Sequence, residues 1–244
     1  MTAPGLPILD LITNEQFREV VALQQTIWGF SDIDLLPVRF FVVASKIGGQ
    51  VFAAYDAVRP AGHQMVAFCL AIPGLKPDGK PYLHSHMLGV LPEYRNTGLG
   101  RRLKMHQKDD ALARGIRLIE WTFDPLEIKN AYFNIARLGV IVRRYARNQY
   151  GITSSALNAG LPTDRCVAEW WLQSPPARGP ILEGIRLPVD IAVIRTTDPD
   201  RARSIQSELA LQFESAFARG LAVIGVERDD TWFNYLLARI GVQP

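Results

Sequence analysis

The sequence has few cysteines, no long apolar run and almost no net charge. Cys69 and Cys166 are its two cysteines, and neither has a CxxC partner, which argues against a disulfide framework and a structural zinc site. No run of 18 apolar residues occurs, so we expect no membrane-spanning helix and no membrane partner. The 27 lysines and arginines exceed the 24 acidic residues by only three, which gives no strong field for nucleic acid.

Residues 1–10 lack a basic start and a long apolar stretch, so we expect no signal peptide and a cytoplasmic location. Both cysteines then serve as small buried apolar residues in a reducing compartment. The composition, with 48% hydrophobic and 21% charged residues, is typical of a folded globular protein. A chain of 244 residues can bury a large core without disulfides or metals.

Glycines and prolines divide the chain into short segments whose order predicts an α+β fold (α/β by layer). The separators at 59–62 and 73–79 have hairpin chemistry, so the strands around them are expected to be antiparallel. Helices are predicted over 15–28, 37–46, 98–114, 126–138 and 198–219, and strands over 6–12, 51–57, 64–72, 82–90, 117–123, 140–142, 165–172, 189–195 and 221–227, with a last short element near 232–237.

A proline-rich stretch over 174–180 has the composition of a linker, which predicts a main domain over 1–175 and an extension over 176–244. The strand–helix–strand order of the extension could lengthen the main sheet, close over an acceptor pocket or form the face of a homodimer. We favour an extension packed on the core, because one helix and two strands cannot easily bury their apolar faces alone.

Residues 88–103 are the most informative stretch, because a predicted strand, a glycine-containing turn and a helix follow one another directly. Glycine lets a backbone approach a ligand closely, and the N–H groups at a helix start attract phosphate. The alternative is a glycine turn that serves chain geometry alone. The spacing matches neither a Walker loop nor a dinucleotide fingerprint.

The run V-x-P-E-Y-R-x-x-G-x-G over residues 90–100 resembles the pyrophosphate-binding motif of the GNAT acyltransferases, which use acetyl-CoA. The order of elements over residues 5–172 is also similar to that fold. The segments SHMLGV at 85–90 and WTFDP at 121–125 resemble a poorly characterised bacterial type. The resemblance implies a GNAT fold, in which helices flank a mixed, mostly antiparallel central sheet, with the strand–helix–strand extension added at its C-terminal end.

By position, the resemblance implies a binding site for CoA and no metal. The backbone of the motif strand would pair with the pantetheine arm like an added strand. The turn amides and one arginine would hold the pyrophosphate, and two asparagines could replace the usual CoA-binding asparagine. These residues are Leu88, Gly89 and Val90 in the strand; Arg95, Asn96, Thr97, Gly98, Leu99, Gly100 and Arg101 in the turn; and Asn130 and Asn134 in the next helix.

The helix after Pro125 departs from the family pattern of asparagine, alanine and tyrosine at eleven, eight and four residues before a glycine. Counting back from Gly139 gives Ile128, Ala131 and Ile135, of which only Ala131 matches. Tyr132 is therefore the candidate acid for the CoA thiolate, with the later tyrosines at 145 and 150 as alternatives. A thiolate is a good leaving group, so the acid could also be dispensable.

Two histidines and one aspartate are the remaining candidates for catalysis. His84 and His86 are two residues apart on a predicted strand and should share a face. In histone-type GNAT enzymes a glutamate base occupies the position of His84, and imidazole can also accept an ammonium proton. The alternative is a hydrogen-bonded core histidine; a metal site lacks a third ligand. Asp124 could bind a cationic substrate or orient a histidine, or it could cap the following helix.

These features together predict an N-acetyltransferase that moves acetyl from acetyl-CoA to a primary amine by direct attack in a ternary complex. The acceptor is expected to be a small molecule or a peptide. Two alternatives stay open: a non-catalytic protein that binds acyl-CoA, and a transferase that uses a longer acyl chain or an alcohol.

Overall fold

The computed structural model describes residues 5–30, 34–151 and 160–241. It divides into two compact units, Met1–Ile119 and Glu120–Pro244, which are treated separately below. The predicted boundary at 175/176 is a different division of the chain and stays a prediction. Within the described ranges, no helix is both long enough and apolar enough to cross a membrane.

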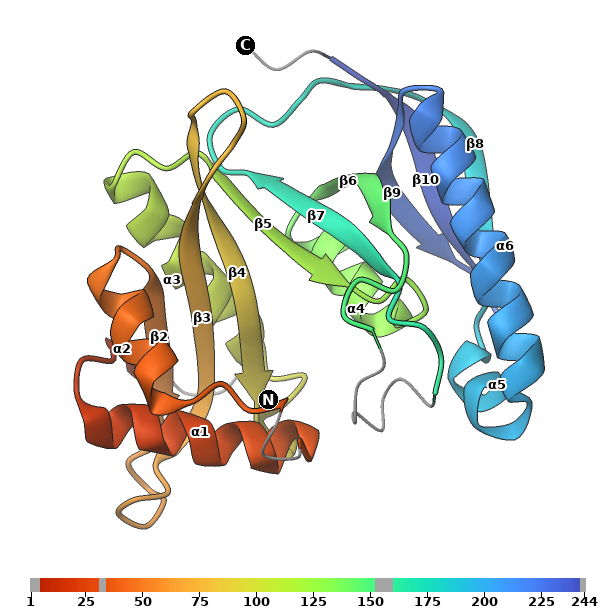
Figure 1. The fold of residues 1–244 in the computed structure, drawn as a ribbon. Coiled ribbons are helices and arrows are strands. Elements are labelled where there is room, and N and C mark those ends of the chain that lie inside the picture. Colours follow the sequence, from red (N-terminus) through yellow and green to blue (C-terminus); the bar gives the residue numbers. More distant parts are fainter. Residues whose placement is uncertain (1–4, 31–33, 152–159, 242–244) are drawn as a thin grey trace. The chain divides into compact units, whose positions relative to one another are not determined.

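The first unit is an antiparallel sheet with helices, drawn in red to green in Figure 1. Its strands lie in the order β1-β2-β3-β4, and every neighbouring pair is antiparallel, as the hairpin separators predict. The elements are β1 (Ile8–Asp10), α1 (Asn14–Trp28), α2 (Val38–Lys46), β2 (Gln50–Tyr55), β3 (Met65–Leu75), β4 (Pro81–Val90), the 3-10 turn η2 (Pro92–Tyr94) and α3 (Leu99–Ala113).

Local signals in the sequence set the helix ends of this unit. Thr13 caps α1: its hydroxyl accepts the Gln16 N–H at 3.2 Å, and the Gln16 side chain accepts the Thr13 N–H at 3.0 Å. Gly29 then ends the helix in the left-handed conformation, where glycine carries no steric penalty. Pro37 precedes the first residue of α2, so its missing N–H costs no helical hydrogen bond.

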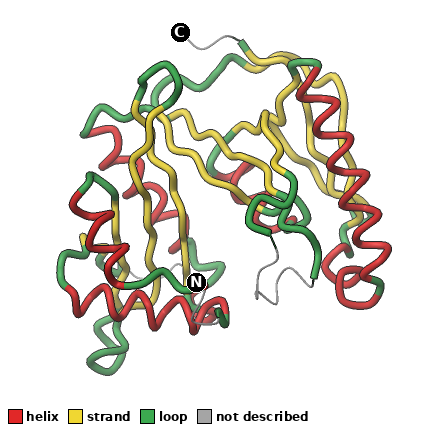
Figure 2. Tube along the Cα trace, in the orientation of Figure 1, coloured by secondary structure: helices red, strands yellow, loops and turns green. Residues whose placement is uncertain are grey.

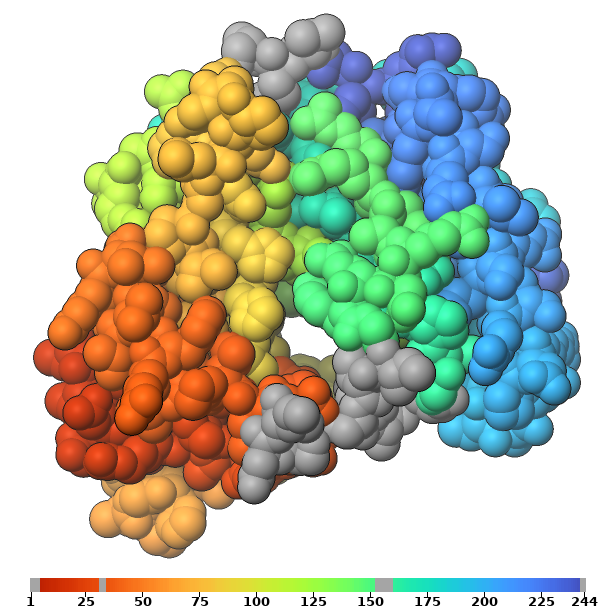
Figure 3. All heavy atoms as spheres, in the orientation of Figure 1, coloured from red at the N-terminus to blue at the C-terminus, as the bar shows by residue number. Residues whose placement is uncertain are grey.

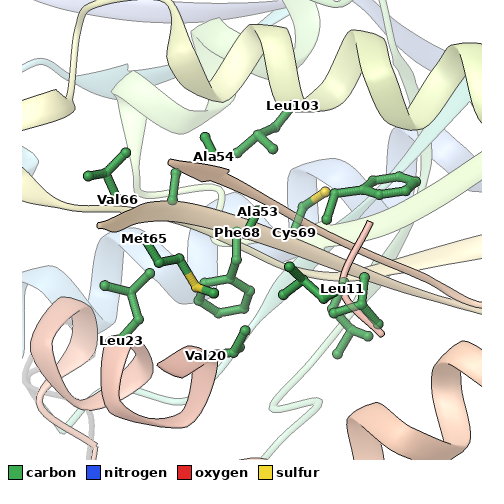
Figure 4. Close-up of a cluster of buried hydrophobic side chains, with 14 of the residues drawn as sticks. Leu11, Val20, Leu23, Ala53, Ala54, Met65, Val66, Phe68, Cys69 and Leu103 are labelled. Atoms are coloured by element: carbon green, nitrogen blue, oxygen red, sulfur yellow. The ribbon is translucent and has the colours of Figure 1, made fainter. Parts of the chain in front are cut away.

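The core of the first unit lies on both faces of its central strands. Figure 4 shows Val20 and Leu23 of α1 on one side of β2 and β3 and Leu103 of α3 on the other. Phe17 and Phe41 stack with ring centroids 6.0 Å apart, which fixes α1 against α2. Strand β4 therefore has α1 and α2 on one face and α3 on the other.

The second unit also contains an antiparallel sheet, in the order β7-β6-β9-β10-β8. The long helix α6 packs on its strands and exposes its other face to solvent, as Figures 2 and 3 show. The elements are β5 (Leu118–Phe123), which carries the boundary, α4 (Ile128–Tyr132), the π-helical turn η3 (Phe133–Arg137), β6 (Ile141–Ala146), β7 (Arg165–Trp171), β8 (Arg178–Pro188), α5 (Ile191–Thr197), α6 (Pro199–Ala218), β9 (Leu221–Arg228) and β10 (Trp232–Ile240).

The predicted mixed fold with a mostly antiparallel sheet and flanking helices is confirmed, but two predictions near the C-terminal end are wrong. The strand expected over 189–195 is helix α5, because Ile191, Ile194 and Arg195 face the interior at helical spacing. The expected linker over 174–180 overlaps β8, which begins at Arg178 and pairs with β10. The extension thus contains one more strand and one more helix than the sequence indicates.

The capping box of α1 gives a stability prediction. We expect Thr13→Ala to lower the free energy of unfolding by about 1 kcal/mol, because the Gln16 backbone N–H loses the hydroxyl that accepts its hydrogen bond. Urea denaturation followed by circular dichroism measures this. The matched control is Thr26→Ala in the same helix, where the hydroxyl bonds back to the Ala22 carbonyl and alanine favours helix. An equal loss in both variants would contradict the capping role.

Candidate functional site

The turn between β4 and α3 has a conformation that few residues adopt. After Val90 and the 3-10 turn η2, Asn96 has φ +61° and Gly98 has φ +88°, both in the left-handed region. Glycine and asparagine tolerate this region best, which explains their presence here. The chain reverses over these residues and enters α3 directly at Leu99.

The backbone amides at the start of α3 are left without protein acceptors. Gly98 is the N-cap and has no side chain to accept their hydrogen bonds. Across the described parts of the chain, no acceptor is found for the N–H groups of residues 96–101, and the first helical bond across the turn is from the Arg102 N–H to the Gly98 carbonyl. These donors and the positive end of the helix dipole form a site suited to an anion.

Contacts from the β2–β3 hairpin hold this turn from outside the motif. The Tyr94 hydroxyl donates to Asp56 Oδ2 at 2.5 Å, and this bond holds the pKa of the Asp56 carboxyl below its usual range. Arg59 pairs with Glu93 at 2.7 Å and lies over the Tyr94 ring. The Thr97 hydroxyl donates to the Tyr94 carbonyl at 2.7 Å. Sequence reasoning missed Asp56 and Arg59, because they lie more than 30 residues before the motif.

The two glycines that flank the turn, Gly89 and Gly100, differ in how much space surrounds them. A Cβ on Gly89 would lie 2.8 Å from the end of the Ile27 side chain and 2.9 Å from the Trp28 ring, so a side chain there would require these groups of α1 to shift. A Cβ on Gly100 would meet only Leu88 and Val90, at an ordinary 3.8 Å. Packing therefore favours glycine at position 89 but gives no reason for it at position 100, where glycine inside a helix costs about 1 kcal/mol relative to alanine.

His84 and His86 lie together on β4, as their spacing predicts. Their ring centroids are 6.0 Å apart, and the His86 ring is 6.4 Å from the Phe40 ring of α2. Burial lowers the pKa of His84 to about 4, and the neighbouring His86 lowers it further; burial also lowers the pKa of His86. Both imidazoles are therefore neutral at pH 7 and can accept a hydrogen bond.

A buried lysine lies behind the histidines and was missed from the sequence. Lys104 of α3 is only 3% exposed, and its Nζ donates to Ser85 Oγ at 2.7 Å and to Gln107 Oε1 at 3.1 Å. Burial lowers its pKa to about 7. One signal was available: Leu99, Leu103 and Gln107 mark the inward face of α3, and Lys104 adjoins it.

In the second unit, the Asp124 carboxylate forms a hydrogen bond and an ion pair within the protein. Its Oδ1 accepts the Leu126 N–H at 2.8 Å, and its Oδ2 pairs with the buried Arg195 at 3.2 Å. Arg195 also pairs with Glu127 at 2.7 Å. Asp124 does not cap α4, whose N-cap is Glu127; it stabilises the turn before the helix and pairs with Arg195. Its catalytic role stays a prediction.

The residues on α4 and η3 divide between surface and interior. Tyr132 is 42% exposed and its ring lies under the Arg137 guanidinium. Asn134 is buried; its amide donates to Asn130 Oδ1 at 3.1 Å, and its oxygen accepts the Trp121 indole N–H at 3.3 Å. Asn134 thus has structural partners on both sides, and the cofactor roles of the two asparagines stay predictions.

The alternative tyrosine acids are both hydrogen-bonded. The Tyr145 hydroxyl donates to Asp164 Oδ2 at 2.8 Å, and burial together with this carboxylate raises the Tyr145 pKa far above its usual value. The Tyr150 hydroxyl lies 2.8 Å from Thr122 Oγ1. A tyrosine with a strongly raised pKa remains protonated at neutral pH. Among the described residues, no group of three or more His, Cys, Asp or Glu side chains could hold a metal ion.

The half-buried imidazole of His84 gives a pH prediction. Its pKa is about 4 in the folded chain against 6.5 in the unfolded chain, so the unfolded state binds the proton first. Stability is then lost as the pH falls from about 6.5 to 4, and His84→Gln should lose less over this window. Urea denaturation at a series of pH values measures the difference. His63→Gln, at an exposed histidine of the β2–β3 turn, is the control; the same pH dependence in both variants would contradict the prediction.

Comparisons with known proteins place this geometry in a family. The model of the Acetyltransferase (GNAT) family matches residues 20–133, which include β4, the turn and α3. No curated protein sequence matches the chain. Similar solved structures include Arabidopsis thaliana NAA60 in complex with acetyl-CoA, with a TM-score of 0.57, 15% identity and coverage of 69% of this chain and 99% of that one.

Two further structures give the same fold. The ribosomal-protein-S18-alanine N-acetyltransferase from Escherichia coli has a TM-score of 0.52 and 19% identity, covering 72% of this chain and 98% of its own. The NatC complex bound to Gag peptide and CoA contains a chain with a TM-score of 0.54 and 16% identity, covering 71% of this chain and all of that one. The family match over the strand–turn–helix segment and this shared fold agree: residues 20–133 are similar to the Acetyltransferase (GNAT) family, and the chain has the fold of the solved acetyltransferases above.

Proposed function

We propose that the protein transfers the acetyl group of acetyl-CoA to a primary amine by direct attack in a ternary complex. The observation that carries this proposal is the row of backbone N–H groups over residues 96–101 that have no protein acceptor within the described chain. A pyrophosphate supplies the oxygens that such donors need, and Arg101, exposed in the first turn of α3, adds positive charge.

The glycine pattern supports the same assignment. Gly100 has no packing requirement in the protein, yet a glycine is retained in the first turn of a helix. A diphosphate close to the backbone would explain the missing side chain. Further back, the backbone of Leu88, Gly89 and Val90 would pair with the pantetheine arm, which directs the thioester along β4.

Direct attack depends on position more than on strong acids and bases. Holding a neutral amine near the thioester carbon converts a bimolecular step into one within a complex. The amine attacks the carbonyl carbon, the C–S bond breaks, and the CoA thiolate takes up one proton as the ammonium of the adduct loses one. His84 and His86, neutral at pH 7, would accept that proton through water, and their low pKa values suit release to solvent.

The proposal also assigns roles to residues of the second unit. Tyr132 would protonate the leaving thiolate, and Asn130 and Asn134 would contact CoA. The acceptor is a small-molecule or peptide amine. Among the structural neighbours, the NatC complex is described as bound to a peptide and CoA, which is consistent with a peptide acceptor.

The turn gives a direct binding prediction. Gly98→Val should weaken acetyl-CoA binding at least about tenfold, because a β-branched residue disfavours the left-handed conformation that aims the amides. Isothermal titration calorimetry measures the dissociation constant. The matched control is Gly62→Val in the β2–β3 turn, where φ is +79° and space is equally open, so backbone strain is similar but distant from the motif.

Equal affinity in wild type and Gly98→Val, or no binding by the wild type at millimolar acetyl-CoA, would contradict the proposed site. Thiol release across a panel of amines then tests catalysis. Tight binding with no release would favour the non-catalytic alternative, and a panel of longer acyl-CoA esters and alcohols separates the remaining transferase alternatives.

A further inference from the structure

The buried side chain of Lys104 links helix α3 to the strand that carries both histidines. Its Nζ is 2.7 Å from the hydroxyl of Ser85, which lies between His84 and His86 in the sequence of β4. Both groups are almost fully buried. The hydrogen bond therefore connects α3 to β4 at Ser85, the residue between the two histidines.

This point of β4 is a β-bulge. Ser85 is opposite Ala71 and Met87 is opposite Leu70, so β4 has one more residue than β3, and His86 is the extra one. A bulge changes which side chains share a face. Ser85 accordingly faces α3, whereas the His86 ring lies beside Phe40 of α2.

Stability alone gives a poor reason for a lysine at this position. A buried ammonium carries a desolvation cost, and an apolar side chain of similar length would pack without it. The surrounding polar layer is also incompletely satisfied: Gln50 Oε1 and Gln107 Nε2 are buried without a hydrogen-bond partner in the described structure. Buried polar groups kept at such a cost point to a requirement for specificity of structure.

We propose that Lys104 is a positioning residue for acyl transfer, which holds Ser85 and so fixes the β4 bulge and the orientation of His84 and His86. The inference rests on the proposed function and deepens it. It assigns a role to a side chain that touches neither substrate nor cofactor and acts from the opposite face of the strand.

Replacing Lys104 would remove a positive charge near His84 as well as the hydrogen bond to Ser85. The Lys104 ammonium, the His86 ring and Lys76 at the end of the β3–β4 hairpin all lower the pKa of His84, after burial. On the α2 side, the uncharged ring of Phe40 lies beside His86. Removing the ammonium should therefore raise the His84 pKa above its value of about 4 and move its titration toward neutrality.

The test compares Lys104→Met, Ser85→Ala and the double variant with the wild type. The double variant replaces both partners by apolar groups, which keeps the core folded where a single change leaves one group unpaired. Lys108→Met on the same helix is the matched control. The first measurement is NMR titration of the four histidine rings, with His84 and His86 assigned by substitution to glutamine.

We expect the His84 and His86 signals to move in all three variants and the His84 pKa to rise in Lys104→Met and in the double variant, with the His63 signals constant. We expect kcat for amine acetylation to fall about tenfold or more, while the acetyl-CoA dissociation constant stays within about twofold. Lys108→Met should match the wild type in every measurement.

A folded double variant with wild-type histidine signals and wild-type kcat would overturn the proposal, because Lys104 and Ser85 would then serve the core alone. Equal losses of kcat and of acetyl-CoA affinity would also overturn it, since the damage would then lie in the cofactor turn. A wild type that binds acetyl-CoA but acetylates no amine would contradict the proposed function instead. The histidine signals would still decide whether Lys104 fixes the two rings.

Discussion

The backbone amides at the start of α3, for which no acceptor lies among the described residues, are the feature on which the proposed chemistry depends. A helix always leaves its first N–H groups without internal partners, and most helices satisfy them with a capping side chain. Thr13 does this for α1, but Gly98 cannot do it for α3. Within the described residues, α1 therefore starts with a side-chain cap and α3 starts without one, and the proposed diphosphate site lies at the start of α3.

Availability is useful only if the turn keeps its shape without the ligand. The bond from Tyr94 to Asp56 and the ion pair between Arg59 and Glu93 tie the turn to the β2–β3 hairpin. Such support lowers the ordering cost of binding, because the donors need not be gathered by the ligand. On the adjoining strand, Gly89 fits closely under α1 and Ser85 bonds to α3, so β4 is constrained from both faces near the proposed thioester path.

Local chemistry explains which parts of the molecule could be predicted from the sequence. The Thr13 cap, the proline before α2, the hairpin turns and the strand–turn–helix motif each depend on residues within a few positions of one another. Helix α5 could not be predicted in this way. Its β-branched residues favour a strand, whereas its helical form is stabilised by Arg195 binding Asp124 and Glu127, which lie about 70 residues earlier. Lys104 was missed for a similar reason, since its partner Ser85 belongs to a different element.

The departure from the family pattern after Pro125 also has a structural account. Five residues, Phe133–Arg137, form a π-helical turn, which contains one more residue per turn than an α-helix. Counting back from Gly139 through this turn therefore does not preserve the helix face. The position four residues before Gly139 is Ile135, which is buried, while Tyr132 reaches the surface beside Arg137. A thiolate that leaves readily needs little help from an acid, so the loss of a tyrosine at this position is compatible with acyl transfer driven by positioning. The proposed reaction would then depend mainly on β4 and the turn, which carry the imidazoles and the proposed cofactor site.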